Sequence, residues 1–233
     1  MKKIELDTLM NLDADFPGFD IWYELWAMEQ YLRVIEEHLP DVIAQAKRRA
    51  ETELKKLDRD MEEGEINIRR QEIAEVAKTI IPRFFWGPTI VSLWALYESS
   101  VEDLAEYVQK REGAKLSLDD IRAKNFRERT AKYFAGVLDF DFGIDRSRDE
   151  KLRIIQEFRN LFAHDGGRLN GLSSQRQTEI RKLVENAPGV EIKNDVVYFS
   201  SSFLRDCFTT IEDILEHMTW LLAKRYRRPV VSK

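Results

Sequence analysis

Arg148-Asp-Glu-Lys-Leu-Arg-Ile-Ile-Gln-Glu-Phe-Arg-Asn-Leu-Phe-Ala-His-Asp-Gly-Gly167 is typical of a single helix followed by a turn. Ser147 and Asp149 are residue types that favour the start of a helix, and the two glycines permit the left-handed conformation that ends one. The stretch therefore predicts a helix that stops at Gly166. Inside it lies the hexapeptide Arg159-Asn-Leu-Phe-Ala-His164, called the motif below.

The predicted helix has one apolar side and one polar side. At about 100° per residue, four apolar side chains cluster on a face that should pack on the core, namely Ile154, Phe158, Leu161 and Phe162. Arg159 falls on one flank of the opposite side, and Asn160 and His164 fall together on the other. Ala163 leaves a shallow gap between the flanks, and Gln156 completes a surface poor in flexible charges. Such a face is more typical of a contact surface than of a solvated one.

The motif resembles the signature of the HEPN superfamily, in which Arg, a polar residue, three further residues and His stand near the end of a core helix. The resemblance covers the motif and an all-helical context over roughly residues 85–226. It implies an all-α helical bundle that acts as a homodimer, with the active site shared between the two motif helices. It further implies a metal-independent endoribonuclease without a cofactor, of the kind found among toxins and antiviral defence effectors.

The residue types of the motif suit that chemistry. A histidine transfers protons near neutral pH, so His164 is the expected general acid or base. The planar guanidinium of Arg159 can bind two phosphate oxygens at once, and Asn160 can hold the histidine ring or donate to phosphate. Glu98 stands at the edge of an apolar helical face and would orient Arg159. The alternative is an edge carboxylate that reaches water or another cation.

A purely structural reading of the motif is also open. A histidine near a helix C-terminus is favourable because the end of the helix carries partial negative charge. Arg159 could pair with Glu98 or Glu157 for stability alone. The chain would then be a non-catalytic helical module that dimerises or binds RNA or protein. If it is a nuclease that cleaves single-stranded regions of RNA, a restraining antitoxin or regulatory partner is expected.

The composition excludes several other classes of protein. The chain has 233 residues and a formal net charge of −5, which disfavours a protein that coats nucleic acid with a basic surface. The single cysteine, Cys207, excludes an intramolecular disulfide and a cysteine-cluster metal site, and its apolar neighbours predict a buried thiol. No signal peptide and no long apolar run stand out, so a cytoplasmic protein without membrane contact is expected.

Two domains are predicted, with one continuous domain as the alternative. Residues 1–84 read as an arm and a long antiparallel helical hairpin that turns at Glu62–Glu65, and Pro40 marks a bend or break within it. The strongest break is Pro82–Pro88, after which residues 85–233 form the HEPN-like bundle. Within this bundle we expect helices from Ser117 to about Leu138 and from about Ser174 to Glu185, a small β-hairpin over 190–199, and a last helix from about Ser200.

Overall fold

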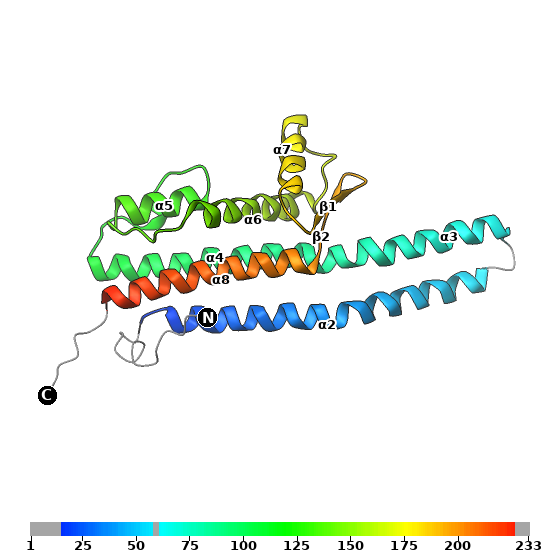
Figure 1. Cartoon of the computed structure of the whole chain (residues 1–233), viewed down its shortest axis with the longest axis horizontal. Coiled ribbons are helices and arrows are strands. Elements are labelled where there is room, and N and C mark those ends of the chain that lie inside the picture. The colour runs from blue at the N-terminus through cyan, green and yellow to red at the C-terminus, as the bar shows by residue number, and fades with distance from the viewer. Residues whose placement is uncertain (1–14, 58–60, 227–233) are drawn as a thin grey trace. The chain divides into compact units, whose positions relative to one another are not determined.

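The computed structural model describes residues 15–57 and 61–226, most of which are helical (Figure 1). The helices are α2 (Gly18–Leu57), α3 (Glu63–Glu75), α4 (Ile81–Glu112), α5 (Phe126–Gly136), α6 (Arg146–Asp165), α7 (Ser174–Glu185) and α8 (Ser201–Tyr226). Two short segments, η2 (Val76–Ile80) and η3 (Leu118–Asp120), are π-helical and 3₁₀-helical. The all-α class predicted from the sequence is confirmed. None of the described helices has both the length and the apolar character to cross a membrane.

The described residues form two compact units, and each boundary between them falls within a helix. The first unit comprises residues 15–28, 92–156 and 207–226, and the second comprises 29–57, 61–91 and 157–206. These units do not coincide with the predicted division into residues 1–84 and 85–233, which stays a prediction. Predictions about residues 1–14 and 227–233 lie outside the described part of the chain.

The first unit is built around clusters of aromatic side chains. Trp94 and Tyr97 of α4 lie with ring centroids 5.2 Å apart, and both contact Phe126 at the start of α5. Asn125 begins α5 because its side chain accepts a hydrogen bond from the backbone of Glu128. The prediction of one helix from Ser117 to Leu138 is therefore wrong. Ser117 caps only the short η3 segment, and a second cap at Asn125 starts a separate helix.

Three residues of the first unit bear on predictions from the sequence. Cys207 is buried, as predicted. The Nε2 of His217 shares a hydrogen bond of 2.8 Å with the carbonyl oxygen of Phe142, which ties α8 to the segment before α6. The spacing of His217 from Asp213, one helical turn, would by itself have indicated only a surface pair. Gln156 is also buried, so it does not belong to the exposed face of α6. For His217 the partner lies 75 positions away in the sequence.

The helical run from Glu63 to Glu112 corrects the predicted break at Pro82–Pro88. The chain passes from α3 through the π-helical η2 directly into α4, so Pro82 and Pro88 both lie within a helix. A π-helical turn shifts the hydrogen-bond pattern and lets a helix accommodate a proline that lacks its own N–H. Pro40 likewise lies inside α2, and the predicted turn at Glu62–Glu65 is wrong because α3 begins at Glu63.

The second unit contains the β-hairpin, whose position was predicted. Strand β1 (Val190–Lys193) pairs antiparallel with β2 (Val196–Phe199), with Glu191 opposite Tyr198. Asn194 and Asp195 both have positive φ, as a two-residue hairpin turn requires. The range Ser174–Glu185 predicted for α7 is confirmed, and its start is capped by the side chain of Ser173, which accepts from the backbone of Arg176.

Candidate functional site

The motif occupies the last two turns of α6, in the second unit. Leu161 is buried, Phe162 is half-buried, and Ala163 and His164 are exposed. Arg159 and Asn160 are half-buried between these extremes. The predicted division of the helix into a packed side and an accessible polar side is therefore confirmed over the motif. Ala163 and His164 thus mark the most accessible side of the motif.

Phe162 anchors the motif helix against three other segments of the second unit. Its ring centroid lies 4.7 Å from that of Phe199 on β2. An added Cβ at Gly87 of α4 would come within 2.5 Å of the ring, and one at Gly167 would come within 2.7 Å. Both contacts are too short for a real side chain, so two glycines are needed to seat this ring.

Phe158 extends this packing one turn earlier in α6. Its ring centroid lies 5.4 Å from that of Phe199 and 5.7 Å from that of Phe203, in edge-to-face arrangements that aromatic rings favour. Phe199 and Phe203 stack on each other with centroids 5.1 Å apart. These rings fix the rotation of α6 about its axis, and that rotation determines where Arg159, Asn160 and His164 point.

Gly166 and Gly167 end α6, as the sequence predicted. Both have positive φ, of 58° and 80°, a conformation that is costly for other residues. Their N–H groups donate to the carbonyls of Phe162 and Leu161 at 3.2 Å, so carbonyls left over at the end of the helix are satisfied. The turn also directs the chain to the hairpin, because the N–H of Val197 donates to the carbonyl of Gly167 at 2.8 Å.

The side chains of Arg159 and Asn160 are joined by a hydrogen bond. The Nη1 of Arg159 donates to the Oδ1 of Asn160 over 3.0 Å. The sequence suggested that Asn160 holds the ring of His164 or donates to phosphate. The structure places its carbonyl oxygen on the guanidinium of Arg159, and donation to phosphate stays a prediction. This hydrogen bond orients the guanidinium and leaves the amide nitrogen of Asn160 as the donor group of that side chain. The imidazole of His164, one helical turn after Asn160, makes no hydrogen bond to another residue of 15–57 or 61–226.

Glu157 of α6 forms an ion pair with an arginine of α7. Its carboxylate forms an ion pair with the Nη2 of Arg176, whose Nη1 also contacts Glu179 at 3.1 Å. Partial burial acts to lower the pKa of the Arg176 guanidinium, but the hydrogen bonds to the two carboxylates outweigh it and the pKa rises. The sequence left open a pairing of Glu157 with Arg159. The structure gives Glu157 to Arg176, which ties α7 to the motif helix.

Glu98 lies on α4 in the first unit and is half-buried. Its predicted role in orienting Arg159 stays a prediction.

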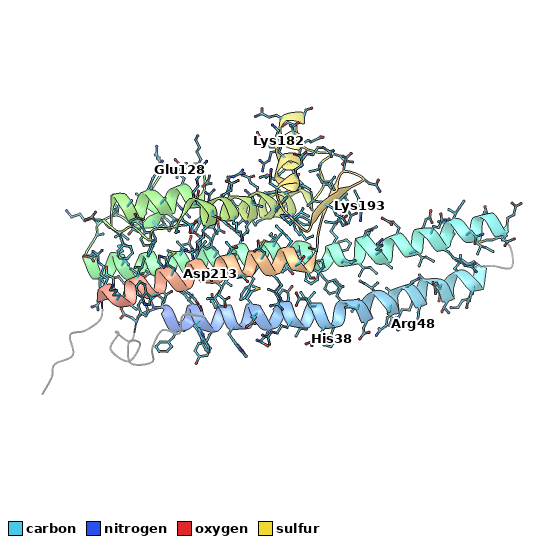
Figure 2. All side chains as sticks on the ribbon, viewed as in Figure 1. His38, Arg48, Glu128, Lys182, Lys193 and Asp213 are labelled. Atoms are coloured by element: carbon cyan, nitrogen blue, oxygen red, sulfur yellow. The ribbon has the colours of Figure 1, made fainter. Side chains whose placement is uncertain are left out.

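Within residues 15–57 and 61–226 there is no group of three or more His, Cys, Asp or Glu side chains that could hold a metal ion. Lys182 of α7 and Lys193 of β1 are cations of the same unit as the motif (Figure 2). Lys193 is paired with Glu191 at 2.6 Å.

Three residues of the second unit that bear on the site were not predicted from the sequence: Arg176, Gly87 and Arg168. Arg176 is separated from Glu157 by 19 positions, and nothing in the sequence marks the two as partners. Gly87 was interpreted as part of a helix break, whereas it makes room for Phe162. Arg168 follows the two glycines and is exposed, with its backbone N–H donating to the carbonyl of Asp165 at 3.1 Å. The sequence Gly-Gly-Arg after the motif was the signal that could have identified it as a further candidate cation.

Comparison of the chain with models of known protein families, with curated proteins and with solved structures finds no match. The function is therefore argued from the motif and its geometry.

Proposed function

We propose that this protein is a metal-independent endoribonuclease that cleaves single-stranded regions of RNA through the 2′-hydroxyl group. The proposal rests on the resemblance of Arg159–His164 to the HEPN motif. One observation carries it: two groups suited to the chemistry lie on one helix whose packed side is fixed by aromatic rings. They are a guanidinium held by Asn160 and an exposed imidazole that makes no hydrogen bond within the described part of the chain. Arg159, Asn160 and His164 are the residues to which we assign the reaction.

The proposed reaction needs a proton acceptor, a proton donor and a cation. The base removes the proton from a ribose 2′-oxygen, which attacks the adjacent phosphorus and forms a new O–P bond. The bond from phosphorus to the 5′-oxygen breaks, and that oxygen takes a proton from the acid. The products are a 2′,3′-cyclic phosphate and a 5′-hydroxyl. Arg159 would stabilise the charge that develops on the phosphoryl oxygens, and His164 would transfer protons.

One copy of the chain supplies one motif histidine, whereas the reaction uses both an acid and a base. A two-fold symmetric dimer brings the same surface of two copies together and so provides a second His164 and a second Arg159. We therefore include a homodimer in the proposal, with the motif faces opposed. The small side chain of Ala163 would let the two helices approach closely. An active nuclease of this kind would act as a toxin or defence effector, and an antitoxin or regulatory partner would restrain it.

The guanidinium of Arg159 provides the first test. The purified 233-residue chain is incubated with an unstructured RNA and with tRNA in the presence of EDTA, and initial cleavage rates are compared among wild type, Arg159→Lys and Arg159→Ala. We expect cleavage by wild type and a loss of about 100-fold or more in Arg159→Ala, because an aligned cation on the developing charge contributes on that scale. Lysine keeps the charge but loses the planar pair of donors, so its rate should fall between the other two.

The matched control is Arg48→Ala, which removes an exposed arginine from α2 and should cleave like wild type (Figure 2). Melting temperatures of all four proteins establish that they are folded. Absence of cleavage by folded wild-type protein, or equal rates in Arg159→Ala and wild type, would contradict the assignment and favour a non-catalytic helical module.

A further inference from the structure

The first two turns of α2 expose an unusual set of aromatic side chains in the first unit. Phe19, Trp22, Tyr23 and Trp26 follow one another at helical spacing and share one side of the helix. Their exposed fractions are 46%, 45%, 59% and 54%, whereas Ile21 on the opposite side is 2% exposed. Trp22 and Tyr23 contact each other edge to face, with centroids 5.1 Å apart. These four side chains are called the aromatic face below.

The aromatic face is large for a surface that meets only water. A fully buried aromatic side chain removes about 150–250 Å² from solvent, so four half-exposed ones present roughly 400 Å² of mainly apolar surface. That area is comparable to the largest apolar patch of a typical monomer, and such patches commonly mark interaction sites. It is about half of what one partner contributes to a specific protein–protein interface, so the aromatic face would form the centre and neighbouring polar residues the rim.

The residues beside the aromatic face carry negative charge. Asp20 and Glu24 lie one turn apart on the flank of α2, and Asp103 lies on the neighbouring α4. Desolvation by burial, followed by the charges of Asp103 and Asp20, raises the pKa of Glu24. Desolvation, followed by the charges of Glu106 and Asp20, raises the pKa of Asp103. Each carboxylate is thus close enough to the others to repel them.

These carboxylates are not neutralised within the described part of the chain. Glu106 pairs with Lys110 at 2.5 Å. By contrast, no ion pair to any residue of 15–57 or 61–226 is made by Asp20, Glu24 or Asp103. A cation brought to this flank would relieve the repulsion and could also lie over the exposed rings, where a cation–π interaction is favourable.

We propose that the aromatic face and its acidic flank bind a cationic amphipathic helix of a partner protein. The partner helix would place apolar side chains at i, i+3 or i+4 and i+7 on the rings, and lysine or arginine beside Asp20, Glu24 and Asp103. A second copy of this chain fits poorly, because a two-fold contact would bring the same three carboxylates toward each other. Nucleic acid and anionic lipid carry the same sign of charge as the flank and are repelled. This proposal does not depend on the nuclease activity.

The test uses two fluorescein-labelled synthetic 18-residue helical peptides with identical leucines on one side and either lysine or glutamate on the other. Fluorescence anisotropy measures their binding to the 233-residue chain in 50 mM and 500 mM NaCl. We expect the lysine peptide to bind at least tenfold more tightly than the glutamate peptide, and more weakly at high salt. Trp26→Ala and the double variant Glu24→Gln/Asp103→Asn should each weaken binding of the lysine peptide about tenfold.

Two matched control variants distinguish binding at the aromatic face from non-specific binding of the peptide elsewhere on the protein. Phe84→Ala removes an exposed aromatic side chain (66% exposed) in the second unit, and Glu185→Gln removes an exposed carboxylate on α7. Both should bind the lysine peptide like wild type. The proposal is overturned if the lysine peptide does not bind, if Trp26→Ala binds it as well as wild type, or if Phe84→Ala and Glu185→Gln weaken it equally. Sedimentation showing a wild-type dimer that Trp22→Ala and Trp26→Ala dissociate would assign the face to a second copy instead.

Discussion

Replacing His164 with alanine is expected to slow RNA cleavage by at least about 100-fold, because a positioned acid or base contributes about 10²–10⁴ to such a reaction. The side chain is exposed and makes no hydrogen bond to another described residue, so its loss should leave the fold intact. Initial rates and melting temperatures are measured on the same preparations. A large rate loss with an unchanged melting temperature separates a catalytic histidine from one that only stabilises the end of α6.

His38 offers the matched control for this substitution. It is also an exposed histidine on a long helix, α2, and lies away from the motif in the sequence (Figure 2). His38→Ala should cleave RNA at the wild-type rate. Expression in cells provides a second readout, since wild type and His38→Ala should slow growth to the same extent and His164→Ala should not. Equal cleavage by His164→Ala and His38→Ala would remove His164 from the proposed mechanism.

Replacing Gly167 with alanine should lower the free energy of unfolding by about 2–5 kcal/mol, which combines two separate costs. A left-handed conformation costs a residue with a Cβ about 1–2 kcal/mol. Overpacking costs about 1–3 kcal/mol more, and the new methyl group would lie 2.7 Å from the ring of Phe162. That ring has little room to move, because Gly87 and Phe199 lie against it. Urea denaturation of the variants measures the total.

Gly166 separates the two costs. It also has positive φ, but an added Cβ there would meet nothing within 4 Å. Gly166→Ala should therefore lose only about 1–2 kcal/mol. In the background of Phe162→Ala, the cost of Gly167→Ala should fall to the value for Gly166→Ala, because the ring it would meet is gone. If Gly166→Ala and Gly167→Ala lower the free energy of unfolding equally in the protein that retains Phe162, the ring of Phe162 adds no steric cost at position 167, which would contradict the prediction.

The sequence predicted those features that depend on neighbours along the chain. The helix of the motif ends where Gly166 and Gly167 permit positive φ, and the hairpin turns at Asn194 and Asp195 for the same reason. The burial of Leu161 and the exposure of His164 follow from helical periodicity. In each case the information lies within about two turns of the residue concerned.

Features that depend on partners distant in sequence were missed or mistaken. Pro82 and Pro88 were interpreted as a break, but the π-helical η2 segment lets the helix continue through them. Glu157 was a possible partner of Arg159, and only the placement of α7 gives it Arg176 instead. Gly87 was interpreted as part of that break because its neighbour in the fold, Phe162, is 75 positions away in the sequence. Packing, and not local preference, decides these positions.

The chemistry at the ends of the cleaved RNA tests the central proposal most directly. Wild-type protein is incubated in EDTA with a single-stranded RNA and with the same RNA carrying 2′-deoxyribose at the cleaved position, and mass spectrometry identifies the product ends. The proposed mechanism predicts a 2′,3′-cyclic phosphate and a 5′-hydroxyl from the RNA, and no cleavage at the deoxy position. Cleavage at the deoxy position, or products with a 5′-phosphate, would contradict attack by the 2′-oxygen and with it the roles given to Arg159 and His164.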